Sequence, residues 1–219
     1  MRYKFYREHK YVSAALNNLE RLVAQTDFTN RSAVEHVEQE FNTLIEMLNG
    51  HAHYENETLH KLLKMKTSAV YKHIEEDHKQ MDETIHKLQA LLQTVKEATQ
   101  EEERIELGYQ FYLWYRKFVG ENLIHLHEEE TIILPELHRL YTDKELREIE
   151  FATYRIMTVE QIIDMMKELF PHMNPADREA LLKDMKDSVP EKLAQAWQDI
   201  QSIIAPAECK NLANKLKIA

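Results

Sequence analysis

Apolar residues recur every three or four positions along most of this chain, which is the spacing of an amphipathic α-helix. No proline interrupts this pattern before Pro135. The pattern predicts four long helices, over residues 3–25, 31–65, 68–98 and 102–140. No stretch shows the two-residue alternation and the turn signals that are typical of strands. Four long helices with short connections predict an all-α protein built on an up-down four-helix bundle.

The pattern changes after Tyr141. The segment Thr142-Asp-Lys-Glu is typical of a capped helix start. Further helix breaks or starts are marked by Pro171, Pro175, Pro190 and Pro206. We therefore expect residues 1–141 to form the four-helix bundle, and residues 142–219 to form a C-terminal helical extension that packs on it.

The phase of the second helix indicates which of its polar residues face the core, because each residue advances about 100° around a helix. The apolar stripe consists of Phe41, Leu44, Leu48, Leu59 and Leu62. His51 and Glu55 fall on this stripe, and their spacing of four residues points both side chains the same way. We expect the opposite side, which carries His53, Glu57 and His60, to face solvent.

The fourth helix repeats this arrangement. Its stripe consists of Leu107, Phe111, Trp114, Phe118 and Ile132. His125 and Glu129 lie on it, again four residues apart. The residues expected to point away are His127, Glu130 and His138. The first and third helices each add one inward histidine, His9 and His78, so each long helix contributes one imidazole.

A single histidine on an apolar stripe is more often a hydrogen-bonded core residue than a ligand. The whole set is different, because four histidines and two glutamates would share one core. Burial costs on the order of several kcal/mol for each unpaired charge. A pair of metal cations would offset that cost, so the set predicts a metal site between the helices.

Composition and charge narrow the classes of partner. The 219 residues include 28 Lys and Arg against 38 Asp and Glu, which gives a formal charge of −10. No basic face concentrates the cations, so we expect neither nucleic-acid binding nor binding to an anionic membrane surface. The sequence has no apolar segment of signal-peptide or membrane-spanning character. The single Cys209 fits a reducing compartment, and we expect a cytoplasmic location.

The order of these residues resembles the hemerythrin-like, or HHE cation-binding, family. It reads as a lone histidine, His-x-x-x-Glu, a second lone histidine, and His-x-x-x-Glu followed six residues later by a proline. The segment His125-Leu137, HLHEEETIILPEL, resembles the fourth-helix signature of the family. The resemblance covers residues 1–140. In addition, Asn174-Pro-Ala-Asp-Arg178 is similar to the start of a C-terminal extension that some members carry.

The resemblance implies a non-haem di-iron centre with an oxo or hydroxo bridge. Glu55 and Glu129 would bridge the two iron ions. His9 and His51 would bind one iron ion, and His78 and His125 would bind the other. Open coordination positions could then take dioxygen, nitric oxide or peroxide, in sensing, detoxification or iron handling. Bulk water would be kept out by Leu48, Ile85, Phe111, Trp114 and Phe118.

One departure from the family concerns the third helix. Oxygen-carrying hemerythrins use a fifth histidine, four residues from the first one on that helix, whereas here those positions are Ile74 and Asp82. This departure argues against simple reversible oxygen carriage. Asp82 and Glu121 are candidates either for a further ligand or for a partner that holds an imidazole N–H. The sequence leaves open which small ligand binds and whether there is turnover.

Three other interpretations of the sequence differ from a hemerythrin-like di-iron centre. Ferritin-like oxidases need two Glu-x-x-His pairs, and only Glu75 with His78 supplies one. A structural zinc site is tetrahedral and does not need six ligands. The third alternative is a helical interaction module with a structural or absent metal, in which a Met-rich apolar helix over residues 156–170 binds a protein partner or a second copy. That helix could equally pack within the protein, and the oligomeric state is open.

Overall fold

The computed structural model describes residues 2–218, apart from the side chains of Lys72, His73 and Glu75. Glu75, the acidic residue of the ferritin-like alternative, therefore lies outside the described side chains. Helices are the regular secondary structure of the described part of the chain, and strands do not occur there, as the sequence predicts. No helix in that part combines the length with the apolar composition needed to cross a membrane.

Contacts divide the chain into two units, which we describe separately. The bundle unit comprises residues 12–140, and the C-terminal unit comprises residues 141–218 together with residues 2–11. The division falls inside α1 (His9–Gln25), so the first turn of this helix is grouped with the C-terminal unit and the remainder with the bundle.

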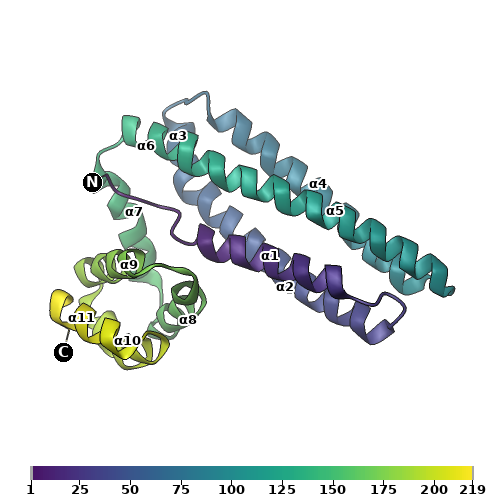
Figure 1. Cartoon of the computed structure of the whole chain (residues 1–219). Helices are drawn as coiled ribbons and strands as arrows, with labels where there is room; N and C mark the ends of the chain where they lie inside the picture. Colours follow the sequence, from purple (N-terminus) through teal and green to yellow (C-terminus); the bar gives the residue numbers. More distant parts are fainter. Residues whose placement is uncertain (1, 219) are drawn as a thin grey trace. The chain divides into compact units, whose positions relative to one another are not determined.

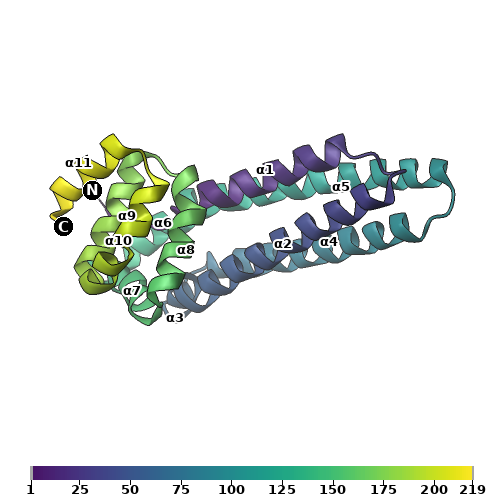
Figure 2. The same cartoon turned by 90° about the horizontal axis from the view of Figure 1, so that it is seen from below.

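Four long helices build the bundle unit (Figure 1). They are α1, α2 (Arg31–Glu55), α4 (Tyr71–Glu97) and α5 (Glu101–Glu128). Figure 1 and the turned view in Figure 2 together show them in the order α1, α2, α4, α5 around the bundle. Leu16, Phe41, Leu88, Phe111 and Phe118 are fully buried between them. The Tyr115 hydroxyl donates a hydrogen bond of 3.0 Å to the Leu16 carbonyl, which ties α5 to α1 inside this core.

Two of these helices continue through short π-helical segments. The segment Asn56–His60 joins α2 to α3 (Lys61–Met65), and Glu129–Ile133 joins α5 to α6 (Leu134–Leu140). The two predicted helices over residues 31–65 and 102–140 are thus continuous, but each contains one wider turn. A π-turn holds one residue more than an α-turn, so the phase of every later residue changes.

The phase change makes some of our burial predictions wrong. Ile132 was expected in the core but is 45% exposed, while Ile133 is buried. In the second helix Leu63 is fully buried in place of the expected Leu62, which is partly exposed. The displacement is one residue in both helices, as one π-turn in each requires.

The first helix starts later than predicted. It begins at His9 and not at residue 3, because Tyr6 has a φ of 65°, in the left-handed region, which interrupts a right-handed helix. Tyr3, Phe5 and Tyr6 are nevertheless buried, in a non-helical segment. Apolar spacing alone does not distinguish such a segment from a helical turn.

The C-terminal unit consists of shorter helices, as predicted. They are α7 (Asp143–Ile156), α8 (Val159–Leu169), a 3₁₀ turn over Phe170–His172, α9 (Pro175–Ser188), α10 (Pro190–Ile203) and α11 (Pro206–Leu216). Thr142 and Glu145 form a reciprocal capping box at the start of α7. Prolines occupy the first positions of α9, α10 and α11, where their missing N–H costs no helical hydrogen bond.

The Met-rich helix is used inside this unit. Ile162, Met166 and Phe170 are fully buried in a core that also contains Trp197. Ile156, at the end of α7, is the exception and is 83% exposed. Most of the apolar surface that suggested a docking helix is therefore covered within the C-terminal unit itself.

Candidate metal centre

Histidine and glutamate side chains gather in the interior of the bundle. His51 and Glu55 lie on α2, and His78 lies on α4. His125 lies on α5, and Glu129 is the first residue of the π-helical segment that follows α5. Glu55, His125 and Glu129 are buried, and His51 and His78 are partly buried.

One group of ligand atoms comes entirely from the bundle unit. Glu55, His78, His125 and Glu129 each offer one atom, and these atoms lie within 4.8 Å of one another. The Nε2 atoms of His78 and His125 are 3.1 Å apart. His125 Nε2 is also 3.4 Å from Glu129 Oε1. Two imidazoles and two carboxylates thus face a common point.

The imidazole of His78 is neutral near pH 7. Burial lowers the pKa of His78 to about 4, and the neighbouring imidazoles of His125 and His60 add to this shift. A neutral imidazole keeps a nitrogen lone pair available, which is the form that binds a metal ion. The site therefore needs no proton to leave His78 before a cation can bind.

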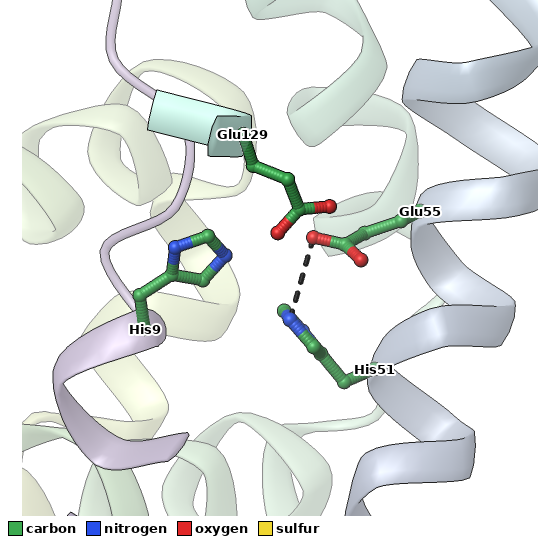
Figure 3. Close-up of side chains that lie close together, drawn as sticks. All are labelled: His9, His51, Glu55 and Glu129. Carbon is green, nitrogen blue, oxygen red and sulfur yellow. Dashed lines mark ion pairs between the residues drawn. The ribbon is translucent and has the colours of Figure 1, made fainter. Parts of the chain in front are cut away.

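A second group consists of His9, His51, Glu55 and Glu129, whose ligand atoms again lie within 4.8 Å of one another. Figure 3 shows both imidazoles and both carboxylates directed toward one another, with the His51 Nε2 and Glu55 Oε1 pair, 3.3 Å apart, drawn as a dashed line. His9 is the first residue of α1, and the centroids of the Tyr6 and His9 rings are 4.5 Å apart. Glu55 and Glu129 thus belong to both groups.

The donor set fits metal ions. Two carboxylates held close together in a buried site repel each other unless one carries a proton or cations lie between them. Imidazole nitrogen combined with carboxylate oxygen suits first-row transition metals such as iron. The six residues proposed from the sequence, namely His9, His51, Glu55, His78, His125 and Glu129, are the ones that make up the two groups.

An acidic residue lies next to one imidazole of the site. The Asp77 carboxylate lies 3.7 Å from His125 Nδ1, the ring nitrogen that faces away from the ligand group. Carboxylates in this position fix the tautomer and the ring angle of a metal-binding histidine. The sequence had suggested Asp82 or Glu121 for such a role. Asp82 is exposed, and Glu121 forms an ion pair with Lys117.

His60 is the residue that sequence reasoning missed. We expected it to face solvent, which is wrong, because it is 1% exposed and its Nε2 lies 3.5 Å from Glu129 Oε1. The π-helical segment that ends at His60 turns it inward. His53, Glu57, His127 and Glu130 are exposed, as the helical phase predicted.

A signal for the wider turns was present in the spacing. Consecutive steps of four residues connect 51, 55, 59 and 63 in one helix and 125, 129, 133 and 137 in the other. Each four-residue step overshoots a full turn by about 40° on an α-helix. Three such steps move off the core-facing side unless a wider turn absorbs the excess, so this spacing favours a π-turn.

A small cavity adjoins the ligand groups within the bundle. Its volume is about 50 Å³, and it is lined by His51, Glu55, His78 and His125 on one side. Leu48, Ile85, Phe118 and Leu126 contribute much of the remaining wall. A space of this size accommodates a diatomic molecule or a water molecule beside the candidate ligands.

Comparison with known families agrees with this geometry. The sequence model of the hemerythrin HHE cation-binding domain matches residues 1–137. No curated protein and no solved structure matches the chain. The match covers more than half of the 219 residues and includes every candidate ligand. The chain therefore belongs to the hemerythrin HHE cation-binding domain family.

Proposed function

We propose that this protein holds two iron ions between Glu55 and Glu129 and binds a small ligand there, either dioxygen, nitric oxide or peroxide. The observation that carries the proposal is that both glutamates belong to the two ligand groups. A carboxylate has two oxygens and can bind one cation with each. Two carboxylates shared in this way hold a pair of cations close together despite their repulsion.

The histidines divide between the two positions. His9 and His51 are assigned to one iron ion, and His78 and His125 to the other, which follows the composition of the two groups. The Asp77 carboxylate lies 3.7 Å from His125 Nδ1, close enough to favour one orientation of that ring. Iron in such a site supplies the redox chemistry and the open coordination positions at which a small ligand binds.

The surrounding residues select for a small ligand. Leu48, Ile85 and Phe118 line the adjoining cavity of about 50 Å³, a volume that suits a diatomic ligand. Their apolar side chains also limit the entry of water. We therefore infer a role in sensing, detoxification or iron handling, with the ligand bound in this cavity. A cytoplasmic location remains a prediction from the sequence.

Iron stoichiometry tests the proposal. We expect the purified chain, loaded with ferrous iron without oxygen and then desalted, to retain about two iron ions. Glu129→Ala and His51→Ala remove a ligand and should lose most of this iron. His127→Ala and His53→Ala are matched controls on the same helices, because both side chains are exposed. Equal iron retention in all four variants, or an iron-free wild-type protein of normal helicity, would contradict the proposal.

A further inference from the structure

We propose that His60 is a seventh metal ligand, which adds a third imidazole to the position occupied by His78 and His125. This inference rests on the proposed function, since it requires that the site holds metal ions. The family-like sequence pattern does not include this residue. His60 belongs to neither His-x-x-x-Glu pair and lies five residues after Glu55.

The position of the His60 ring supports the assignment. Its Nε2 lies 3.5 Å from Glu129 Oε1, and its ring centroid is 5.4 Å from that of His78. His60 is 1% exposed, so water does not solvate this nitrogen. Within the described part of the chain, Nε2 has no hydrogen-bond partner. A buried ring nitrogen that makes no hydrogen bond is uncommon in folded proteins, and a bound ion is one of the groups that accounts for it.

The tautomer of His60 also fits a ligand. Its other ring nitrogen, Nδ1, lies 3.1 Å from the side-chain oxygen of Asn56. An amide oxygen accepts hydrogen bonds, so this contact favours the tautomer of His60 that carries its proton on Nδ1. Nε2 is then left with a lone pair directed toward Glu129. Metal-binding histidines commonly have their second ring nitrogen held in this way.

The π-helical segment explains how His60 reaches the site. On an α-helix, a residue five positions after Glu55 would lie about 140° away from it. A π-turn brings residues five apart to the same side of the helix. Glu55 and His60 flank the segment Asn56–His60, so both side chains face the bundle interior.

The two halves of the site differ at this position. The fourth helix has the same arrangement of His125, Glu129 and a π-helical segment, but its residue five positions after the glutamate is Leu134. The third imidazole therefore comes from the second helix alone. The His78 and His125 position gains a third imidazole, whereas the His9 and His51 position has two.

Mössbauer spectroscopy of iron-loaded protein tests the inference, because it reports the two iron environments separately. We expect two distinct subspectra in the wild type. His60→Leu should alter one subspectrum and weaken iron retention against a chelator by at least about tenfold. His53→Leu is the matched control, since it removes an exposed imidazole from the same helix. It should leave both subspectra and the retention unchanged.

Two further variants distinguish the loss of a metal ligand from a folding defect. His60→Gln keeps a polar side chain of similar length, and Asn56→Leu keeps His60 but removes the acceptor at Nδ1. Asn56 is exposed, so its replacement leaves the core intact. We expect both variants to alter the same subspectrum as His60→Leu, with circular dichroism unchanged.

The outcomes separate the two proposals. If the wild type loads two iron ions and the variants at positions 60 and 56 match it in spectrum and retention, the assignment of His60 is wrong and the proposed function stands. If the wild type takes up no iron pair, the proposed function fails, and the assignment of His60 fails with it.

Discussion

Single side chains next to the two candidate ligand groups can influence how the imidazoles are oriented without belonging to either group. Asp77 is the clearest case, because its carboxylate is 3.7 Å from His125 Nδ1. Asp82 lies four residues after His78 and next to the cavity, and its side chain is exposed. Both aspartates lie on α4, so they can be compared within one helix.

We expect Asp77→Asn to weaken iron binding by about 10- to 100-fold, the usual effect of losing such an orienting carboxylate. Asp82→Asn should change the affinity by less than about threefold, because the Asp82 side chain is exposed to solvent. Competition with a chromogenic chelator measures both. A larger loss in Asp82→Asn than in Asp77→Asn would show that Asp82 is the orienting residue or a ligand.

The six residues of the two groups could be picked out from the sequence, because His-x-x-x-Glu places both side chains on one face of any regular helix. Their role as metal ligands stays a prediction. His60 could not be predicted with an α-helical phase, and neither could Asp77. Asp77 lies near His125 across two helices, and a contact between α4 and α5 leaves no trace in the residue spacing along either helix.

The four long helices follow from the regular spacing of apolar residues. Their observed boundaries and burial differ from the prediction where a local feature interrupts that spacing. The two π-turns shift the burial pattern by one residue, and the left-handed Tyr6 delays the start of α1. Neither feature changes the count or the order of the long helices. The sequence thus predicts the bundle more reliably than the phase of each turn.

Two glycines of α5, Gly108 and Gly120, differ in how closely other residues pack on them. Gly108 lies against the ring of Phe28, and a Cβ atom at position 108 would overlap that ring. No atom lies within 4 Å of a Cβ built at Gly120. The two positions share a helix but differ in the space available for a methyl group.

We expect Gly108→Ala to lower the free energy of unfolding by about 1–3 kcal/mol, because the Phe28 ring must move. Gly120→Ala should raise it by about 0.5–1 kcal/mol, since alanine favours the helix over glycine. Thermal unfolding of the iron-free protein measures both. Equal changes at the two positions would contradict the close packing of Phe28 on α5.

The N-terminal segment, residues 2–11, belongs with the C-terminal unit. Asp184 on α9 accepts a hydrogen bond of 3.1 Å from the Tyr3 hydroxyl and forms an ion pair of 3.0 Å with Arg7. The sequence could not reveal this association, because single polar residues 181 positions apart carry no periodic signal. Helix caps and prolines, which are local, were predicted correctly in the same unit.

This polar cluster also contains a carboxyl group with an unusual pKa. Burial raises the pKa of Glu150 from 4.5 to about 7, and the negative charges of Glu8 and Asp184 add to the effect. Arg7 and a hydrogen bond from the Tyr154 hydroxyl oppose it. Between pH 4.5 and 7, the folded chain therefore holds a proton on Glu150 that the unfolded chain releases.

Because unfolding releases this proton, we expect the free energy of unfolding of the C-terminal unit to fall as the pH rises from about 4.5 to about 7, by roughly 2–3 kcal/mol. Glu150→Gln removes the titrating group, so the stability of this variant relative to the wild type should rise over the same range. Glu148→Gln on the same helix should not have this effect, because Glu148 is exposed and Arg155 lowers its pKa.

Tryptophan fluorescence can report this unit alone. The chain has two tryptophans, Trp114 in the bundle and the buried Trp197 in the C-terminal unit. In a Trp114→Phe background, urea unfolding followed at Trp197 gives the stability of the C-terminal unit at each pH. If Glu150→Gln and Glu148→Gln have the same pH dependence as their parent, Glu150 does not hold a proton in the folded protein near neutral pH.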